Sequence, residues 1–434
     1  MATKFHLAWF LNYVADEWNG TWGDGAKDFT GDFYVEMAQS LERACFDYIL
    51  IEDKLMVSTA YDGTMKYDLK HGVNPKFDPV PLAVAMLLAT KRLGVCATMS
   101  SSFYPPFMLA RLASTVDHMS RGRFGWNLVT SAEDRAAQNF GLDRLYEHDE
   151  RYNIAEEFVE VVTKLWDSWE PDAVVRDHET GTLVDHTKVH TIDFEGKYFK
   201  SRGPLNTARS PQGWPAIAQA GASVPGRELA SRYADTIVAP ANGIEAMKAY
   251  REDIRDRMAG HGREPDDMQV LYIVAPILGD THEEAVAKKH RWHNDPLYLE
   301  YQLAEISSIT EINFAEFDLD EPVPADISTN GERGALESFL SRGRDKTLRE
   351  LVTGNGMGGG NLDFTGTPDE VAEKMIEVMD GVGGDGFLIT SPVMRLNRRY
   401  ITEITDGLVP ALQKRGAART VYDHEMLRDN LRAF

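Results

Sequence analysis

Eight short apolar runs alternate with longer amphipathic segments along most of the chain, and this alternation restricts the fold more than any other feature. The runs span residues 5–11, 48–52, 93–99, 123–129, 215–219, 235–239, 269–278 and 386–391. The last four are continuous rather than alternating in polarity, as expected for parallel strands covered on both faces. The segments between the runs have helical periodicity at 33–46, 82–91, 107–119, 150–166, 224–233, 244–258, 283–290 and 369–379. Eight strands, each followed by a helix, predict an α/β fold, a (β/α)8 TIM barrel.

Three connections are too long to be simple turns between a strand and a helix. They follow strands two, four and seven and span about 54–81, 169–214 and 291–364. The chain shows neither an internal repeat nor a Pro/Ser-rich linker, so we expect one domain, 1–434, with three insertions that project from the barrel. A doubly wound parallel sheet is the alternative architecture, because strand counts from a single sequence can err by one or two.

Composition restricts the partners and the compartment. With 46 Lys plus Arg against 68 Asp plus Glu, the formal charge is −22, which disfavours nucleic acid and anionic membranes as partners. Cys45 and Cys96 are the two cysteines, too few for a disulfide framework or a four-thiolate zinc site. We also see neither a signal peptide nor an apolar run long enough to span a membrane. A soluble cytoplasmic protein is expected.

Polar residues stand where the predicted strands end, which is where the chemistry of this architecture is carried. Asp53 follows the second strand, Thr98 ends the third and Asn127 lies in the fourth. After the fifth strand, a turn of small residues leads to Ser223 at the start of a helix. Each residue also has a purely structural reading, since Asp53 can cap a turn, Thr98 and Asn127 can satisfy backbone groups and Ser223 can cap its helix.

Two predicted helix starts are candidate ligand sites. Ser223 lies where free N–H groups and the helix dipole favour an anion, so it is a candidate phosphate ligand. At the other start, His148 and Tyr152 are four residues apart and can face the same side, while Asp149 can cap the helix. His148 and Tyr152 can donate to hydroxyl or phosphate groups, or they can belong to a well-capped surface helix.

Other patterns point less directly to function. His178, His186 and His190 match no common zinc spacing, and no metal site is expected. The string 354–359 has the form G-x-G-x-x-G without a preceding strand, so it predicts a glycine-rich lid rather than a dinucleotide fold. Aromatic residues gather near the ends of strands one and three, and they either pack in the core or line an apolar pocket. They are Trp9, Phe10, Trp18, Trp22, Phe103 and Tyr104.

Longer motifs resemble a known family. The strings at 122–131, 139–141 and 147–152 closely resemble the nitrilotriacetate monooxygenase group of bacterial luciferase-like flavoproteins. The likeness continues through shorter strings and covers nearly the whole chain, weakest after strand two and in the third insertion. The shorter strings lie at 203–205, 210–213, 219–221, 366–368, 385–387 and 409–416. Members of this group include dibenzothiophene sulfone, long-chain alkane and aminopolycarboxylate monooxygenases.

The resemblance implies an FMN-dependent monooxygenase that receives reduced FMN (FMNH2) from a separate NAD(P)H:flavin reductase and reacts it with O2. The family's flavin ligands fall on Asp53, Thr98, His148, Tyr152 and Ser223. The resemblance places Tyr152 and Ser223 at the phosphate, His148 near the ribityl chain, and Asp53 and Thr98 toward the isoalloxazine ring. Asn127 would lie beside the ring and steer O2 or a flavin (hydro)peroxide. No nicotinamide-binding fingerprint appears in the chain, which fits a reductant consumed elsewhere.

Several points stay open. Several relatives carry a histidine just before the Gly-x-Trp of the first loop, whereas here the run 17–22 reads EWNGTW, so any acid-base role of that histidine is not transferred. The alternatives are an F420-dependent oxidoreductase of the same superfamily and a non-catalytic flavin-binding protein. The expected substrate is a small organic molecule. The aromatic residues favour an apolar or aromatic one, whereas Lys54, Lys66 and Lys70 are equally suited to a carboxylate. Relatives suggest a homodimer or homotetramer.

Overall fold

The computed structural model describes residues 3–11, 30–324, 326–353, 362–392 and 397–434. At its centre, eight parallel strands close into a barrel in the order β1-β14-β11-β10-β9-β4-β3-β2. These strands are β1 (His6–Leu11), β2 (Tyr48–Ile51), β3 (Gly94–Ser100), β4 (Phe124–Val129), β9 (Ala216–Ala220), β10 (Thr236–Pro240), β11 (Gln269–Val274) and β14 (Gly386–Ile389). Each predicted run contains one barrel strand, so the predicted (β/α)8 barrel is confirmed. The doubly wound alternative is wrong, because this sheet closes on itself.

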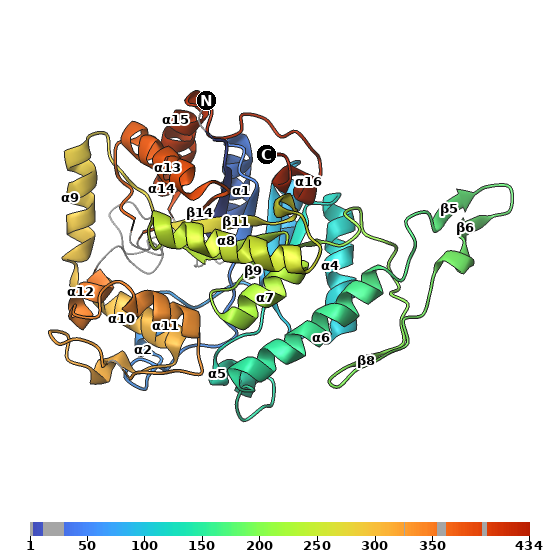
Figure 1. Ribbon diagram of the computed structural model, residues 1–434, viewed down its shortest axis with the longest axis horizontal. Helices are drawn as coiled ribbons and strands as arrows, with labels where there is room; N and C mark the ends of the chain where they lie inside the picture. Colours follow the sequence, from blue (N-terminus) through green and yellow to red (C-terminus); the bar gives the residue numbers. More distant parts are fainter. Residues whose placement is uncertain (1–2, 12–29, 325, 354–361, 393–396) are drawn as a thin grey trace.

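Helices surround the barrel (Figure 1). Eight of them correspond to the eight predicted segments. They are α1 (Asp32–Arg43), α3 (Pro79–Ala89), α4 (Pro106–Ser120), α6 (His148–Trp166), α7 (Val224–Tyr233), α8 (Ile244–Gly260), α9 (His282–His293) and α13 (Pro368–Val382). Helices α3 and α13 begin before their predicted starts, because Asp78 and Thr367 cap them and a proline occupies the first turn. In the part of the chain that the structure describes, no helix has the length and apolarity needed to cross a membrane.

The seventh predicted strand is really two strands. The barrel strand β11 ends at Val274, and β12 (Ile277–Leu278) pairs instead with β13 (Thr365–Gly366) in a separate sheet. The apolar run continues across the break, so its composition does not reveal it. Pro276 lies between the two strands, and its missing N–H is consistent with the interruption.

The first and third insertions pack against each other, beside the barrel (Figure 1). The first insertion contains α2 (Lys66–Lys70), which contacts α10 (Pro296–Thr310) of the third. The third also contains α11 (Arg333–Leu340) and α12 (Leu348–Thr353), and it has a small core of its own that includes Ile306, Phe314 and Phe339. The first insertion ends earlier than the predicted residue 81, because α3 already begins at Pro79. The third insertion begins later than the predicted residue 291, because α9 continues to His293.

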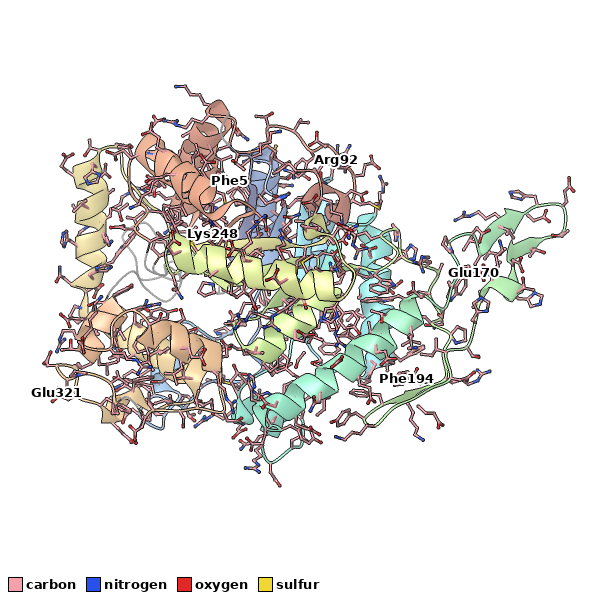
Figure 2. All side chains as sticks on the ribbon, in the orientation of Figure 1. Phe5, Arg92, Glu170, Phe194, Lys248 and Glu321 are labelled. Carbon is pink, nitrogen blue, oxygen red and sulfur yellow. The ribbon has the colours of Figure 1, made fainter. Side chains whose placement is uncertain are left out.

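The second insertion forms an arm that extends away from the barrel (Figure 1). It consists of two hairpins, β5 (Val174–Asp177) with β6 (Thr182–Val184) and β7 (Phe194–Glu195) with β8 (Lys200–Ser201). Figure 2 labels Glu170 and Phe194 in this arm. They lie on the opposite side of the molecule from Glu321, which belongs to the third insertion. The arm is therefore separate from the first and third insertions.

The C-terminal residues of the chain close one end of the barrel. Helix α16 (Leu427–Leu431) places Leu427 and Leu431 in the cluster that fills the barrel interior, together with Ala8, Tyr48 and Leu50. The backbone N–H of Leu427 donates to the carbonyl of Gly122, just before β4, at 2.9 Å. This end therefore carries the amino ends of the strands, and the carboxyl ends face the first and third insertions.

Candidate functional site

Thr98 and Asn127 lie at the carboxyl ends of β3 and β4 and join three neighbouring strands. The Thr98 hydroxyl donates to the carbonyl of Ile51 at 2.6 Å, and the amide of Asn127 donates to Thr98 Oγ1 at 2.7 Å. Asn127 is buried, and its Oδ1 has no hydrogen-bond partner within the described residues. Because a buried acceptor without a partner is costly, this oxygen is suited to a ligand that donates a hydrogen bond.

Asp53 follows β2 and is partly buried. Burial raises its pKa to about 7; Lys76 opposes this shift, whereas the carboxylates of Glu52 and Asp78 add to it. Lys76 is itself engaged, because its Nζ forms an ion pair with Glu52 at 2.5 Å. Asp53 can therefore change protonation state near neutral pH.

The raised pKa of Asp53 predicts a pH-dependent stability. Because the folded-state pKa exceeds the ordinary value of 3.8, the folded protein binds more protons than the unfolded chain between about pH 4 and 7. Relative to Asp53→Asn, the wild type should lose roughly 1–3 kcal/mol of stability as the pH rises through this window. Urea unfolding of both proteins from pH 4.5 to 8 measures the difference, and a constant difference would contradict the shift.

Tyr152 and Ser223 meet at the first turn of α7. Ser223 caps this helix, accepting from the backbone N–H of Gly226 at 3.3 Å. Burial raises the pKa of Tyr152, and the side chains of Ser223 and Thr130 oppose this shift. A Cβ on Gly226 would lie 3.0 Å from Tyr152 Oη and 3.2 Å from Ser223 Oγ. Two hydroxyls and the free N–H groups of a helix start therefore converge at this point, an arrangement suited to a phosphate.

His148 extends this group along α6. It is the first residue of the helix and is buried, its ring centroid lies 5.0 Å from that of Tyr152, and its Nδ1 is 2.8 Å from Asp149 Oδ1. Thr130, whose side chain is among the groups that lower the pKa of Tyr152, follows β4, the strand that carries Asn127. The structure thus brings Thr98 and Asn127 together at the strand ends, and His148, Tyr152 and Ser223 together at two helix starts. Asp53 follows β2, the strand whose Ile51 carbonyl accepts from Thr98.

Sequence reasoning missed two residues of the α7 site. Tyr250 of α8 donates to the carbonyl of Gly221 at 2.5 Å and so holds the loop after β9. Arg227 lies over the Tyr250 ring, 5.7 Å from its centroid, and forms an ion pair with Asp253 at 2.7 Å. Arg227 follows Ser223 by four residues, a spacing that could have suggested it. Tyr250 carries no such signal, because its contact is made across the fold.

The aromatic residues near strands one and three divide between core and surface. Trp9 is fully buried against Phe46 and Tyr400, so it belongs to the core. Phe103 stacks on the half-exposed Phe140, with ring centroids 4.3 Å apart. Two further predictions concern the aromatic residues in the run 17–22 and a glycine-rich lid at 354–359. Both segments lie outside the described residues.

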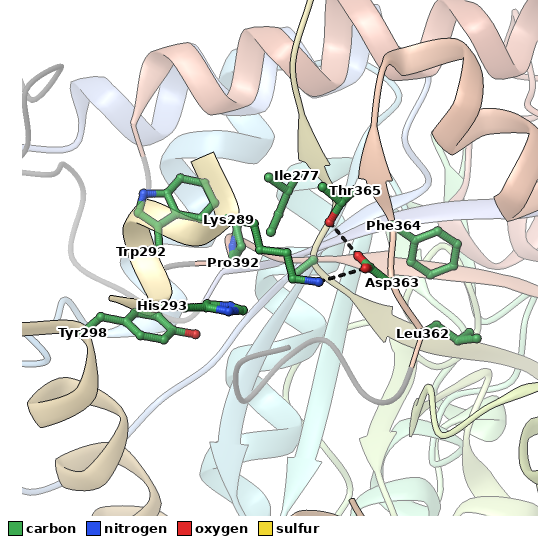
Figure 3. Close-up of a pocket in the computed structure, with 11 residues that line it drawn as sticks. Ile277, Lys289, Trp292, His293, Tyr298, Leu362, Asp363, Phe364, Thr365 and Pro392 are labelled. Atoms are coloured by element: carbon green, nitrogen blue, oxygen red, sulfur yellow. Dashed lines mark hydrogen bonds and ion pairs between the residues drawn. The ribbon is translucent and has the colours of Figure 1, made fainter. Parts of the chain in front are cut away.

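A small pocket opens beyond the ends of β11 and β14 (Figure 3). On one wall, Lys289 forms an ion pair with Asp363 at 2.9 Å, and Thr365 donates to the same carboxylate at 2.5 Å. On another wall, the rings of His293 and Tyr298 are stacked, and burial lowers the pKa of His293 to about 4. The residues that line this pocket include none of the six predicted site residues.

Among the described residues, no three His, Cys, Asp or Glu side chains are arranged to hold a metal ion.

Comparison with known proteins identifies the family. The model of the luciferase-like monooxygenase family matches residues 5–386. Dibenzothiophene-sulfone monooxygenase of Rhodococcus erythropolis (strain XP) is 36% identical over 443 residues, covering 99% of this chain and 96% of that protein. Nitrilotriacetate monooxygenase component A of Aminobacter aminovorans is 35% identical over an alignment that covers 92% of this chain and 89% of that protein.

A solved structure is similar over the same extent. The crystal structure of riboflavin lyase with modified FMN and substrate riboflavin superposes with a TM-score of 0.87 at 29% identity, covering 100% of this chain and 96% of that one. The closed barrel, the match of the family model and full-length relatives above 30% identity agree. The chain belongs to the luciferase-like monooxygenase family.

Proposed function

We propose that this protein is the oxygenase component of a two-component monooxygenase that uses reduced FMN and O2 to oxygenate a small organic substrate. The observation that carries the proposal is the meeting of Tyr152 and Ser223 at the start of α7. This arrangement suits the terminal phosphate of FMN, because hydroxyl donors and a helix N-terminus both favour a dianion. The solved riboflavin lyase structure, which contains modified FMN, supports the same cofactor class.

Each predicted site residue has a proposed role. Tyr152 and Ser223 bind the phosphate, and His148 donates to the ribityl chain from the neighbouring turn of α6. Asp53 and Thr98 face the isoalloxazine ring, and the buried Oδ1 of Asn127 accepts a hydrogen bond beside it. When bound, reduced FMN supplies the two electrons with which one oxygen atom of O2 enters the substrate and the other leaves as water. The protein excludes water and orients the substrate.

The proposal includes a partner. Reduced FMN must come from a separate NAD(P)H:flavin reductase, either by docking or by diffusion. One relative is named nitrilotriacetate monooxygenase component A, and this name supports a system with more than one component. A homodimer or homotetramer remains our expectation for the assembly.

An anaerobic titration tests the proposal. The purified protein is titrated with FMN, reduced FMN and F420, and the reduced complex is then mixed with oxygenated buffer while the absorbance spectrum is followed. We expect tight binding of reduced FMN, weaker binding of FMN, and a transient spectrum that differs from both free forms before reoxidation.

Each alternative function gives a different result in the same experiment. Binding of F420 alone would identify a hydride-transferring oxidoreductase. Binding of FMN in both redox states, with reoxidation no different from that of free flavin, would identify a non-catalytic flavin-binding protein. Failure of all three to bind would refute the flavin assignment.

A further inference from the structure

The pocket beyond β11 and β14 lies across the barrel from the strand ends that carry Thr98 and Asn127. It is bounded by Ala275, which directly follows β11, and by Pro392, which comes shortly after β14. In the closed order of the strands, β11 stands four positions from β3 in either direction, and β14 stands four positions from β4. The pocket and the two strand-end residues therefore occupy opposite sides of the carboxyl end of the barrel, where the chemistry of this architecture is carried.

Three polar side chains of α9 and α10 extend toward the pocket. Figure 3 shows Lys289, His293 and Tyr298 pointing to the side on which Asp363 lies. In the part of the chain that the structure describes, neither the His293 ring nitrogens nor the Tyr298 hydroxyl forms a hydrogen bond. Tyr298 is only 8% exposed, so its hydroxyl lacks free access to bulk water. Because an unpaired buried donor is costly, this hydroxyl is suited to a ligand that accepts a hydrogen bond.

The polar groups of the pocket carry no net charge at neutral pH. Lys289 and Asp363 form an ion pair at 2.9 Å, so their charges balance. Burial lowers the pKa of His293 to about 4, which leaves the ring neutral, and burial raises the pKa of Tyr298 to about 12, which leaves its hydroxyl protonated. An ionic ligand would lose hydration here without meeting an opposite net charge. A neutral ligand avoids this cost.

Apolar groups form other walls of the pocket. Ile277 of β12 and Trp292 of α9 line it, and the rings of His293 and Tyr298 stack with their centroids 5.8 Å apart. Sites for small molecules combine such apolar walls with a few polar groups that fix the orientation of the ligand. Because this pocket is small, it is suited to one end of a molecule rather than to the whole of it.

The lysines of the first insertion offer no free site for a carboxylate. Lys54 is buried and forms an ion pair with Glu305 of α10 at 2.9 Å. Lys70 forms an ion pair with Glu300, also of α10, at 2.5 Å. A substrate carboxylate would therefore have to displace a protein partner from either lysine.

We propose that this pocket binds one end of the substrate, and that this end is a neutral group, such as a carbonyl, that accepts a hydrogen bond from Tyr298. Tyr298 is then a specificity-determining residue, and the stacked His293 ring holds the Tyr298 ring in place. The inference rests on the proposed function, because it concerns the substrate of that reaction. It also separates the substrate pocket from the residues proposed to bind the flavin.

The test uses four small molecules that share one phenyl ring. Acetophenone carries a neutral acceptor, ethylbenzene lacks it, and benzoate and the benzylammonium ion carry a charge. Their dissociation constants are measured by calorimetry at neutral pH on the anaerobic protein, with and without reduced FMN, for the wild type, Tyr298→Phe and Tyr301→Phe. Tyr301→Phe is the matched control, because it removes the same hydroxyl from the same helix at a position that does not line the pocket.

We expect the wild type to bind acetophenone more tightly than the other three molecules. Tyr298→Phe should reduce the preference for acetophenone over ethylbenzene by about three- to ten-fold, the effect of one neutral hydrogen bond. Tyr301→Phe should leave this preference unchanged. Equal binding of acetophenone and ethylbenzene, tighter binding of either ion, the same loss in both variants, or binding of none of the four would overturn the inference.

Reduced FMN distinguishes a failure of the inference from a failure of the proposed function. Because the pocket and the strand-end residues lie on opposite sides of the barrel, reduced FMN should not compete with acetophenone. Competition would place acetophenone in the flavin site, which would overturn the inference and leave the proposed function standing. Binding of acetophenone that depends on Tyr298, in a protein that does not bind reduced FMN, would refute the flavin assignment and retain the preference of the pocket.

Discussion

Replacing Ser223 with Asp should weaken the binding of reduced FMN by at least about a hundred-fold and leave the fold intact. Asp is as good a helix cap as Ser, so the bond that now runs from the Gly226 N–H to Ser223 Oγ at 3.3 Å can be retained. The new carboxylate, however, would face the phosphate. Two like charges about 4 Å apart repel by about 4 kcal/mol at the effective dielectric constant of a protein surface.

The measurement is an anaerobic fluorescence titration with reduced FMN, combined with circular dichroism and thermal unfolding to establish that the variant is folded. Thr281→Asp is the matched control, because Thr281 caps α9 in the same way, accepting from the backbone N–H of Glu284. It should bind reduced FMN as the wild type does. Unchanged affinity in a folded Ser223→Asp protein would refute the phosphate assignment.

Shortening Leu427 to Ala should destabilise the protein by about 2–5 kcal/mol, the cost of a large-to-small change in a packed core. Leu427 is fully buried in the cluster that fills the barrel interior. The neighbouring backbone leaves little room to close the resulting cavity, since a Cβ on Gly94 would lie 2.6 Å from Leu427 Cδ1. The ion pair between Arg428 and Asp235, at 2.6 Å, holds α16 in place while the cavity remains.

Urea unfolding of the variant and the wild type measures this loss. Leu88→Ala is the control, because Leu88 is 62% exposed on α3 and its truncation should change the free energy of unfolding by less than about 0.5 kcal/mol. Reduced-FMN affinity of the folded Leu427→Ala protein should be unchanged, since α16 closes the amino ends of the strands. Equal stability of the two variants would show that α16 does not support the barrel.

The barrel was predictable because its signal is local. Continuous apolar runs and helical periodicity locate all eight barrel strands and eight of the helices around them, and α7 was predicted with its observed bounds. The helices α14 (Arg398–Thr402) and α15 (Val409–Lys414), which follow the last barrel strand, were not predicted. The break between β11 and β12 was missed, because both strands are apolar and differ only in the strand with which each pairs. Helices of the insertions, such as α10 and α11, were missed because those segments were treated as loops.

The site was predictable to the extent that its residues lie at strand ends and helix starts. Ser223 and Tyr152 were chosen from such positions and from the family resemblance, and the structure brings their hydroxyls together. The partner of Lys54 was not predictable. Lys54 and Glu305 are 251 positions apart in the sequence, and their pairing removes a cation that the sequence alone offers to a substrate.

The sequence by itself determined the barrel, the family resemblance and the strand-end and helix-start candidates, because periodicity and short motifs are encoded within a few neighbouring residues. Tertiary structure decided which charges pair between the first and third insertions, that the C-terminal helix closes the amino ends of the strands, and that Tyr250 holds the loop after β9. The physical reason is that ion pairing, burial and the pKa shifts they cause depend on distances across the fold, and these distances do not follow from separation along the chain.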